Sequence, residues 1–166
     1  ARTALLAQLE TINQFPPSFA DSNGAIVAFQ ITARELLAGL ARDDKDLESA
    51  MRELDLAIAA ARHLADLTPE SERHLKECLL LRTKGAQLRS IQRFPEALQS
   101  LREAEDYLAH MPAESRGDRW AAVASDLQDS LAQAAKGAGD PTAELATIEK
   151  WSRLAEEHLP HTEGAS

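Results

Sequence analysis

The stretch LRTKGAQLRSIQRFPEALQSLREAEDYL, residues 81–108, carries the strongest structural signal in this chain. Its apolar residues recur at helical spacing on both sides of a break at 93–95, where a proline fits the first turn of a new helix but not a helix interior. Small residues, Gly85, Ala97 and Ala104, stand where two helices would touch. The stretch therefore predicts two amphipathic helices closed into a hairpin.

The composition of the whole chain favours an all-α fold. Apolar residues make up 44% of the 166 residues and aromatic residues only 4%. Most of the apolar share is Ala and Leu, which are strong helix formers. No segment has the β-branched and aromatic enrichment that is typical of strands. The length fits a single domain, 1–166, with a core of its own.

Helical periodicity and capping residues divide the chain into about seven helices, and the short turns between them predict antiparallel neighbours. The expected order is a first helix over 2–14, helix pairs over 24–65, 69–110 and 113–159, and a frayed tail over 160–166. Gly137 and Gly139 are expected in the turn of the last pair, as helix stops.

Several side chains are expected to face the core of this helical domain. In the helix over 24–42, the inward set is Ile26, Phe29, Ala33, Leu36, Leu37 and Leu40, with Asp21, Ser22 or Asn23 as the cap. Trp120 and Trp151 are interpreted as core residues, with an interface anchor as the alternative. Cys78 lies in an apolar stretch and is interpreted as a small core residue.

The hairpin around residue 94 resembles a tetratricopeptide repeat (TPR), a helix–turn–helix unit of about 34 residues. The matching positions are Leu81, Gly85 and Leu88 in the first helix, Phe94 at the turn, and Ala97, Leu101 and Ala104 in the second helix. Lys84 departs from the leucine of the TPR pattern. Ala50 and Ala97 hold equivalent positions 47 residues apart. The match is motif-grade only over 78–111, and the resemblance is to a looser, TPR-like class.

The resemblance implies an α-solenoid in which stacked helix pairs form a concave groove that binds a protein or a peptide. An irregular α-helical bundle is the alternative fold, because it predicts the same helices without the groove. The two readings differ only in how the pairs stack.

In a TPR array the first helix of each pair lines the groove, which makes the arginines of these helices candidates for partner binding. Arg82, Arg89 and Arg93 fall on one face of the helix over 69–92, and Arg42 and Arg119 lie on the comparable helices. Guanidinium groups suit carboxylates, so the predicted ligand is an acidic segment or a C-terminal carboxylate.

The alternative for these arginines is structural. Cations near a helix C-terminus interact favourably with the helix dipole. Arg82 or Arg89 would then pair with a nearby carboxylate such as Glu77 or Glu103.

Other function classes find little support in the sequence. A net charge of −9 argues against direct nucleic-acid binding, which needs a basic face. One cysteine cannot form an internal disulfide or a cysteine-based metal site. No catalytic motif, cofactor motif or metal-ligand spacing occurs, so we expect no enzyme activity, no cofactor and no metal.

The sequence thus predicts a non-catalytic protein–protein interaction module, part of a larger regulator or assembly and cytoplasmic. A ligand- or peptide-sensing domain of a bacterial signalling or transcriptional regulator is the alternative. No apolar run suggests a membrane span. Self-association through an open end of the array remains a further alternative.

Overall fold

The computed structural model describes residues 2–15, 23–67, 71–111 and 116–158, and the regular structure in these ranges is entirely α-helical. The helices are α1 (Arg2–Asn13), α3 (Gly24–Asp43), α4 (Leu47–Leu67), α5 (Ser71–Ser90), α6 (Phe94–His110), α7 (Asp118–Ala138) and α8 (Pro141–His158). The predicted all-α fold is confirmed for this part of the chain. The predicted tail over 160–166 and the predicted helix start at 69 lie outside it. The helix predicted from 113 begins only at Asp118, after the cap Gly117.

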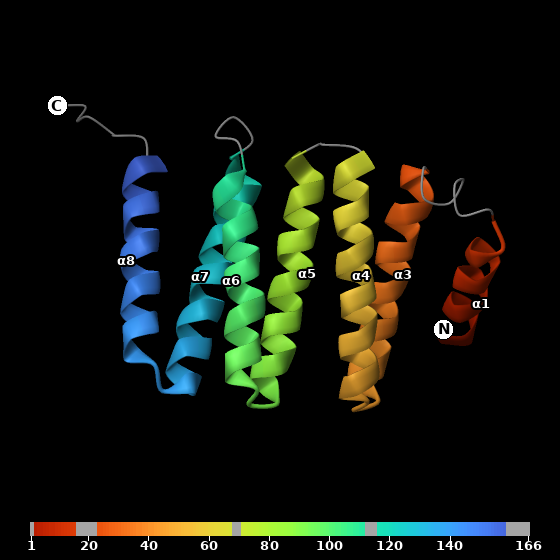
Figure 1. Cartoon of the computed structure of the whole chain (residues 1–166), viewed down its shortest axis with the longest axis horizontal. Helices are drawn as coiled ribbons and strands as arrows, with labels where there is room; N and C mark the ends of the chain where they lie inside the picture. Colours follow the sequence, from red (N-terminus) through yellow and green to blue (C-terminus); the bar gives the residue numbers. More distant parts are fainter. Residues whose placement is uncertain (1, 16–22, 68–70, 112–115, 159–166) are drawn as a thin grey trace.

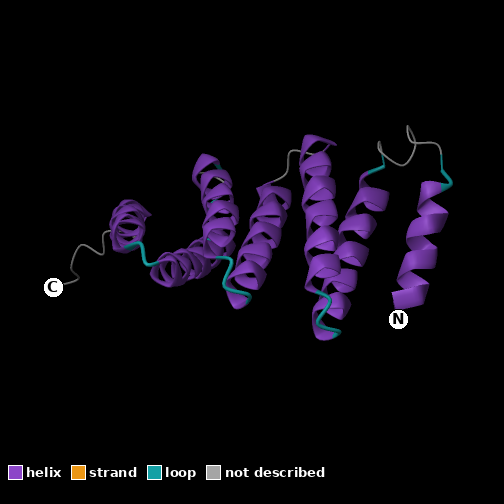
Figure 2. Cartoon of the chain, turned by 60° about the horizontal axis from the view of Figure 1, so that its bottom comes forward, coloured by secondary structure: helices purple, strands orange, loops and turns teal. Residues whose placement is uncertain are grey.

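The helices follow one another in chain order along the long axis of the molecule, and α4 overlaps α3 and α6 overlaps α7 in this view (Figure 1). The most extensive contacts join α3 to α4 and α5 to α6, and α7 packs on α6, α5 and α8. In the turned view of Figure 2, α8 is seen nearly end-on and α7 is foreshortened, while α3 and α4 are seen mostly from the side, so the helix direction changes along the molecule.

Three of the turns between helices share one hydrogen-bond pattern, in which an amide closes back on the carbonyl five residues earlier. The pairs are Asp46 to Ala41 at 2.8 Å, Arg93 to Leu88 at 2.9 Å and Asp140 to Ala135 at 3.0 Å. The residue before each amide has a positive φ: Lys45 at 62°, Gln92 at 60° and Gly139 at 69°. This is the Schellman arrangement of a helix C-terminus. Equivalent atoms recur 47 residues apart, the spacing that separates Ala50 from Ala97.

Gly85 gives α5 and α6 their close approach, as the sequence predicts. A Cβ placed on Gly85 would lie 2.6 Å from Cγ of Leu101, which is fully buried. Gly137 differs from its prediction, because α7 continues to Ala138 and contains it. Its missing side chain leaves room for the ring of Phe94. Gly139 alone is the left-handed helix stop.

Helix α3 exposes large apolar side chains to solvent on one face. Asn23 caps the helix through its side chain, one of the predicted alternatives. Ala33 and Leu37 are buried, whereas Phe29 is 37% and Leu36 53% exposed, so their predicted inward orientation is wrong. Within the described part of the chain, α3 packs on α4 and, less extensively, on α1.

By length and composition α3 could also cross a membrane, a test that the core helices of soluble proteins pass as well. The sequence-based expectation of no membrane span is therefore neither supported nor opposed by this helix.

Replacing Gly85 by Ala should destabilise the protein, because the new methyl group forces Leu101 out of a well-packed position. The expected loss is about 1–3 kcal/mol of unfolding free energy in a urea titration. Gly39→Ala is the matched control, since nothing lies within 4 Å of its added Cβ. That control should gain about 0.5–1 kcal/mol from helix propensity. Equal effects at the two sites would contradict the packing argument.

Candidate functional site

A hollow of about 310 Å³ opens where α3, α5 and α7 meet. Its walls are formed by Arg42 of α3, by Arg82, Thr83, Ala86, Gln87 and Ser90 of α5, and by Ser130 of α7. The cause of the opening is the packing of α5, which contacts α7 directly and α3 hardly at all. We refer to this space as the α3–α5–α7 hollow. It joins two of the predicted site residues, Arg42 and Arg82.

Arg82 is held on one edge only. Its Nη1 donates to Oδ2 of Asp126 on α7 at 2.7 Å, whereas its Nε is buried and has no hydrogen-bond partner. The sequence analysis gave Glu77 or Glu103 as the carboxylate with which Arg82 would pair in a structural role. This predicted partner is wrong, because both of those carboxylates bind Arg62 of α4.

Arg42, on the facing wall, is only loosely engaged. Its Nη2 and Nε lie 3.3 and 3.4 Å from Oδ1 of the adjacent Asp43. The side chain is 54% exposed. Exposed ion pairs of this kind contribute little free energy, so the Arg42 guanidinium can turn toward another anion at low cost.

Gln87 is the residue of the hollow that sequence reasoning missed. Its side chain is only 7% exposed, and its Oε1 is buried without a hydrogen-bond partner. A buried polar atom left in this way costs free energy unless something binds it. A comparison of positions 47 residues apart in the sequence would have singled it out. The positions equivalent to Gln87 hold the apolar residues Leu40 and Ala134.

The other three predicted arginines do not line the hollow. Arg89 lies on α5 with its Nη1 buried and unpartnered. Arg93 leaves the predicted face because α5 ends at Ser90 and the positive φ of Gln92 turns the chain. Arg119 lies in the first turn of α7. Along a helix it is about 16 Å from the level of Ser130, at 1.5 Å per residue.

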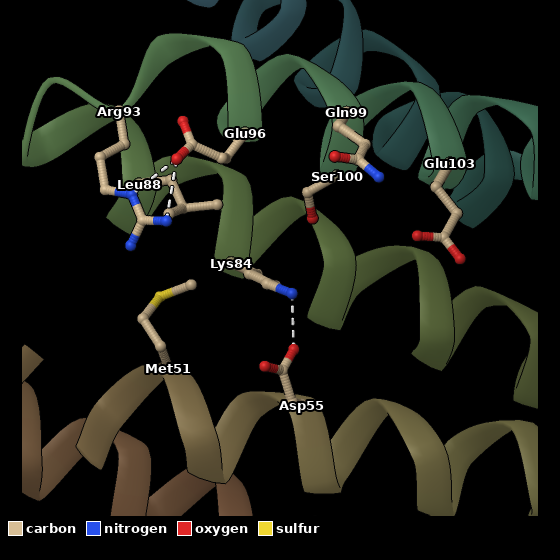
Figure 3. A pocket seen from close by; sticks show the side chains of 9 residues that line it. All are labelled: Met51, Asp55, Lys84, Leu88, Arg93, Glu96, Gln99, Ser100 and Glu103. Atoms are coloured by element: carbon tan, nitrogen blue, oxygen red, sulfur yellow. Dashed lines mark hydrogen bonds and ion pairs between the residues drawn. The ribbon is translucent and has the colours of Figure 1, made fainter. Parts of the chain in front are cut away.

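Arg93 lies instead beside a second groove, of about 260 Å³, between α4 and the α5–α6 pair (Figure 3). The lining residues are Met51, Asp55, Lys84, Leu88, Arg93, Glu96, Gln99, Ser100 and Glu103. Its cations are already neutralised within the groove: Lys84 binds Asp55 at 2.5 Å and Arg93 binds Glu96 at 2.8 Å. The second groove therefore offers a ligand fewer unmet polar groups than the α3–α5–α7 hollow.

Ion pairs fix α5 against the preceding helix pair, α3 and α4. Arg62 of α4 donates from Nε to Oε1 of Glu77 on α5 at 2.6 Å and from Nη2 to Glu103 on α6. Glu77 is 1% exposed. Lys76, next to it on α5, binds Glu35 of α3 at 2.5 Å. These contacts set the position of the helix that supplies most of the hollow.

The electrostatics around Arg62 favour its charged form. Partial burial works to lower its pKa, but the hydrogen bond to Glu77 and the charge of Glu103 outweigh this effect and raise the pKa above the ordinary value. Burial and the charge of Glu77 raise the pKa of the neighbouring Tyr107. Burial likewise raises the pKa of the Cys78 thiol to about 12. Cys78 is thus a core residue, as predicted, and a poor nucleophile.

The tryptophans belong to the core, as predicted. Trp120 and Trp151 are 6% and 5% exposed, with ring centroids 6.4 Å apart. Trp120 donates from Nε1 to the carbonyl of Leu108 at 3.1 Å, and Arg116 lies over its ring. This packing joins α6, α7 and α8.

Replacing Arg62 by Met should destabilise the protein, because it leaves the buried Glu77 without its cation. We expect a loss of about 2–3 kcal/mol, less than for a fully buried pair because water reaches Arg62. Urea unfolding followed by circular dichroism measures this change. Arg52→Met on the same helix is the control, since Arg52 is exposed and its guanidinium donates to Ser49, one turn away on that helix. Similar losses of unfolding free energy in both variants would contradict a specific stabilising role of the Arg62–Glu77 ion pair.

No group of three or more His, Cys, Asp or Glu residues that could hold a metal ion occurs in the described ranges. A scan of protein-family models and searches of curated proteins and solved structures found no match to this chain. Function is therefore argued from the α3–α5–α7 hollow.

Proposed function

We propose that this chain is a non-catalytic, TPR-like interaction module that binds a peptide segment of a partner protein in the α3–α5–α7 hollow. Two features support a repeated hairpin architecture: the Schellman turns at 47-residue spacing and the paired packing of α3 with α4 and of α5 with α6. The hollow lies on the first helices of these pairs, where a TPR-like array presents its groove.

The observation that carries the proposal is the unmet hydrogen-bonding capacity of the hollow. Oε1 of Gln87 is an acceptor without a donor, and Nε of Arg82 is a donor without an acceptor. Both atoms are buried, and both side chains line the hollow. When they turn into it, a peptide segment supplies both complements, because its main chain has N–H donors and its acidic side chains or C-terminus have carboxylates. Arg42 provides a second cation from the facing wall.

The hydroxyl groups of the hollow are consistent with binding rather than catalysis. Thr83 and Ser130 donate to main-chain carbonyls four residues earlier, at 2.8 Å each, and Ser90 to the carbonyl of Gln87 at 2.6 Å. None of the lining residues is a histidine or a carboxylate that could act as their base. An activated nucleophile needs such a base.

Charge reversal should test the two arginines. Peptides selected from a random display library on the wild-type protein should bind the Arg42→Glu, Arg82→Glu double variant at least about tenfold more weakly, since charge-assisted hydrogen bonds are lost. Fluorescence anisotropy with the selected peptides measures the change. Arg52→Glu on α4, outside the hollow, is the control with unchanged affinity. Unchanged binding in the double variant would exclude the hollow as the site.

Gln87→Leu should separate a binding role from a structural one. Leucine removes the unpartnered Oε1, so the free protein should become about 1 kcal/mol more stable. The same change removes an acceptor for the ligand, so the selected peptides should bind about five- to tenfold more weakly. Thermal unfolding and anisotropy measure the two effects. A variant that is less stable, or that binds as well as the wild type, would contradict this role.

A further inference from the structure

Asp126 occupies one edge of the guanidinium that the proposed ligand would use. Its Oδ2 accepts from Nη1 of Arg82 at 2.7 Å, and its side chain is 59% exposed. The pair joins α5 to α7, and Arg82 itself lines the hollow. The Nε of Arg82 is buried without a partner, but the Arg82 side chain as a whole is 31% exposed. A ligand carboxylate that binds the exposed part of the Arg82 guanidinium must therefore approach a carboxylate that is already bound.

The positive charges that line the hollow are each offset by a neighbouring carboxylate of the protein. The cations are Arg42 and Arg82, and each contacts a carboxylate of the protein, Asp43 and Asp126 respectively. A ligand with only negative charge meets two arginines whose fields are largely cancelled, on a protein with a net charge of −9. Like charges brought together in this way reduce affinity.

A ligand that carries a cation beside its carboxylate meets a different environment. Its carboxylate can accept from the exposed part of the Arg82 guanidinium, while its ammonium group can approach the exposed Asp126. A main-chain N–H can donate to the side-chain oxygen of Gln87, a lining residue of the same hollow, once that side chain turns toward the ligand. Each group of such a ligand then has a complement, and no like charges are left facing one another.

We propose that Asp126 is a specificity-determining residue that makes the hollow prefer peptide segments in which acidic and basic side chains alternate over purely acidic segments. This inference rests on the proposed peptide-binding function. It narrows the acidic partner expected from the sequence to a partner of mixed charge. Asp126 acts here by discriminating against the wrong ligand as well as by attracting the right one.

Three fluorescein-labelled peptides of equal length test this inference by anisotropy at low salt. The central residues are Glu-Lys-Glu-Lys, Glu-Glu-Glu-Glu or Gly-Ser-Gly-Ser, with identical flanking residues. The wild-type protein should bind the alternating peptide about two- to fivefold more tightly than the acidic peptide, the range expected for exposed charge pairs. Asp126→Asn should abolish or reverse this preference, because the variant frees Arg82 and loses the site for the ligand ammonium.

Asp106→Asn is the control for net charge. Asp106 is exposed on α6, outside the hollow, and its replacement removes the same charge. The control should keep the wild-type preference, and circular dichroism should show unchanged helicity in both variants.

The outcomes separate the two proposals. An unchanged preference in Asp126→Asn, or a wild-type preference for the acidic peptide, would overturn the role of Asp126 while leaving peptide binding in place. Binding of both charged peptides no better than the Gly-Ser peptide, by the wild type and by Asp126→Asn alike, would refute the proposed function and this inference together.

Discussion

The arrangement of the helices depends on the ion-pair bridge from Arg62 to Glu77 and Glu103. One guanidinium on α4 binds a carboxylate on α5 and another on α6, and so connects the second helix of one pair with both helices of the next. Glu77 is almost completely buried, and a buried carboxylate is tolerated only with a partner. The position of α5 relative to α4 is thereby constrained by charge as well as by apolar packing.

The hollow follows from how α5 is held. Ion pairs to Glu35 and Asp55 tie it to α3 and α4 at points along its length, while its closest packing is with α6, then with α4 and α7, and hardly with α3. Long polar side chains reach across a distance that apolar side chains would close. The side of α5 that faces α3 therefore remains open, and Arg42, Arg82 and Gln87 line the opening.

Much of the local structure could be predicted from the sequence. Helix periodicity, the prolines and the small residues predicted the helices of the described part of the chain, most of them within about two residues of their bounds, and Gly85 was correctly expected at a close contact. These features depend on neighbours in sequence or on a single facing helix.

The prediction that Arg82, Arg89 and Arg93 share one helix face was wrong. It extended one helix through Gln92, whose positive φ ends the regular helical geometry. Phe29 and Leu36 were misplaced because the apolar pattern of α3 does not show which faces have neighbours.

The sequence by itself determined the helices, their turns and the identity of the small contact residues, because these depend on local backbone preferences and side-chain size. Only the tertiary structure decided that Arg42 and Arg82 share one hollow, that Asp126 rather than Glu77 or Glu103 binds Arg82, and that Gln87 is buried without a partner. Arg42 and Asp126 are 40 and 44 positions from Arg82 in the sequence, and their encounters depend on the tilt and spacing of whole helices. That spacing is set by long-range ion pairs and packing, for which the periodicity of one segment carries no information.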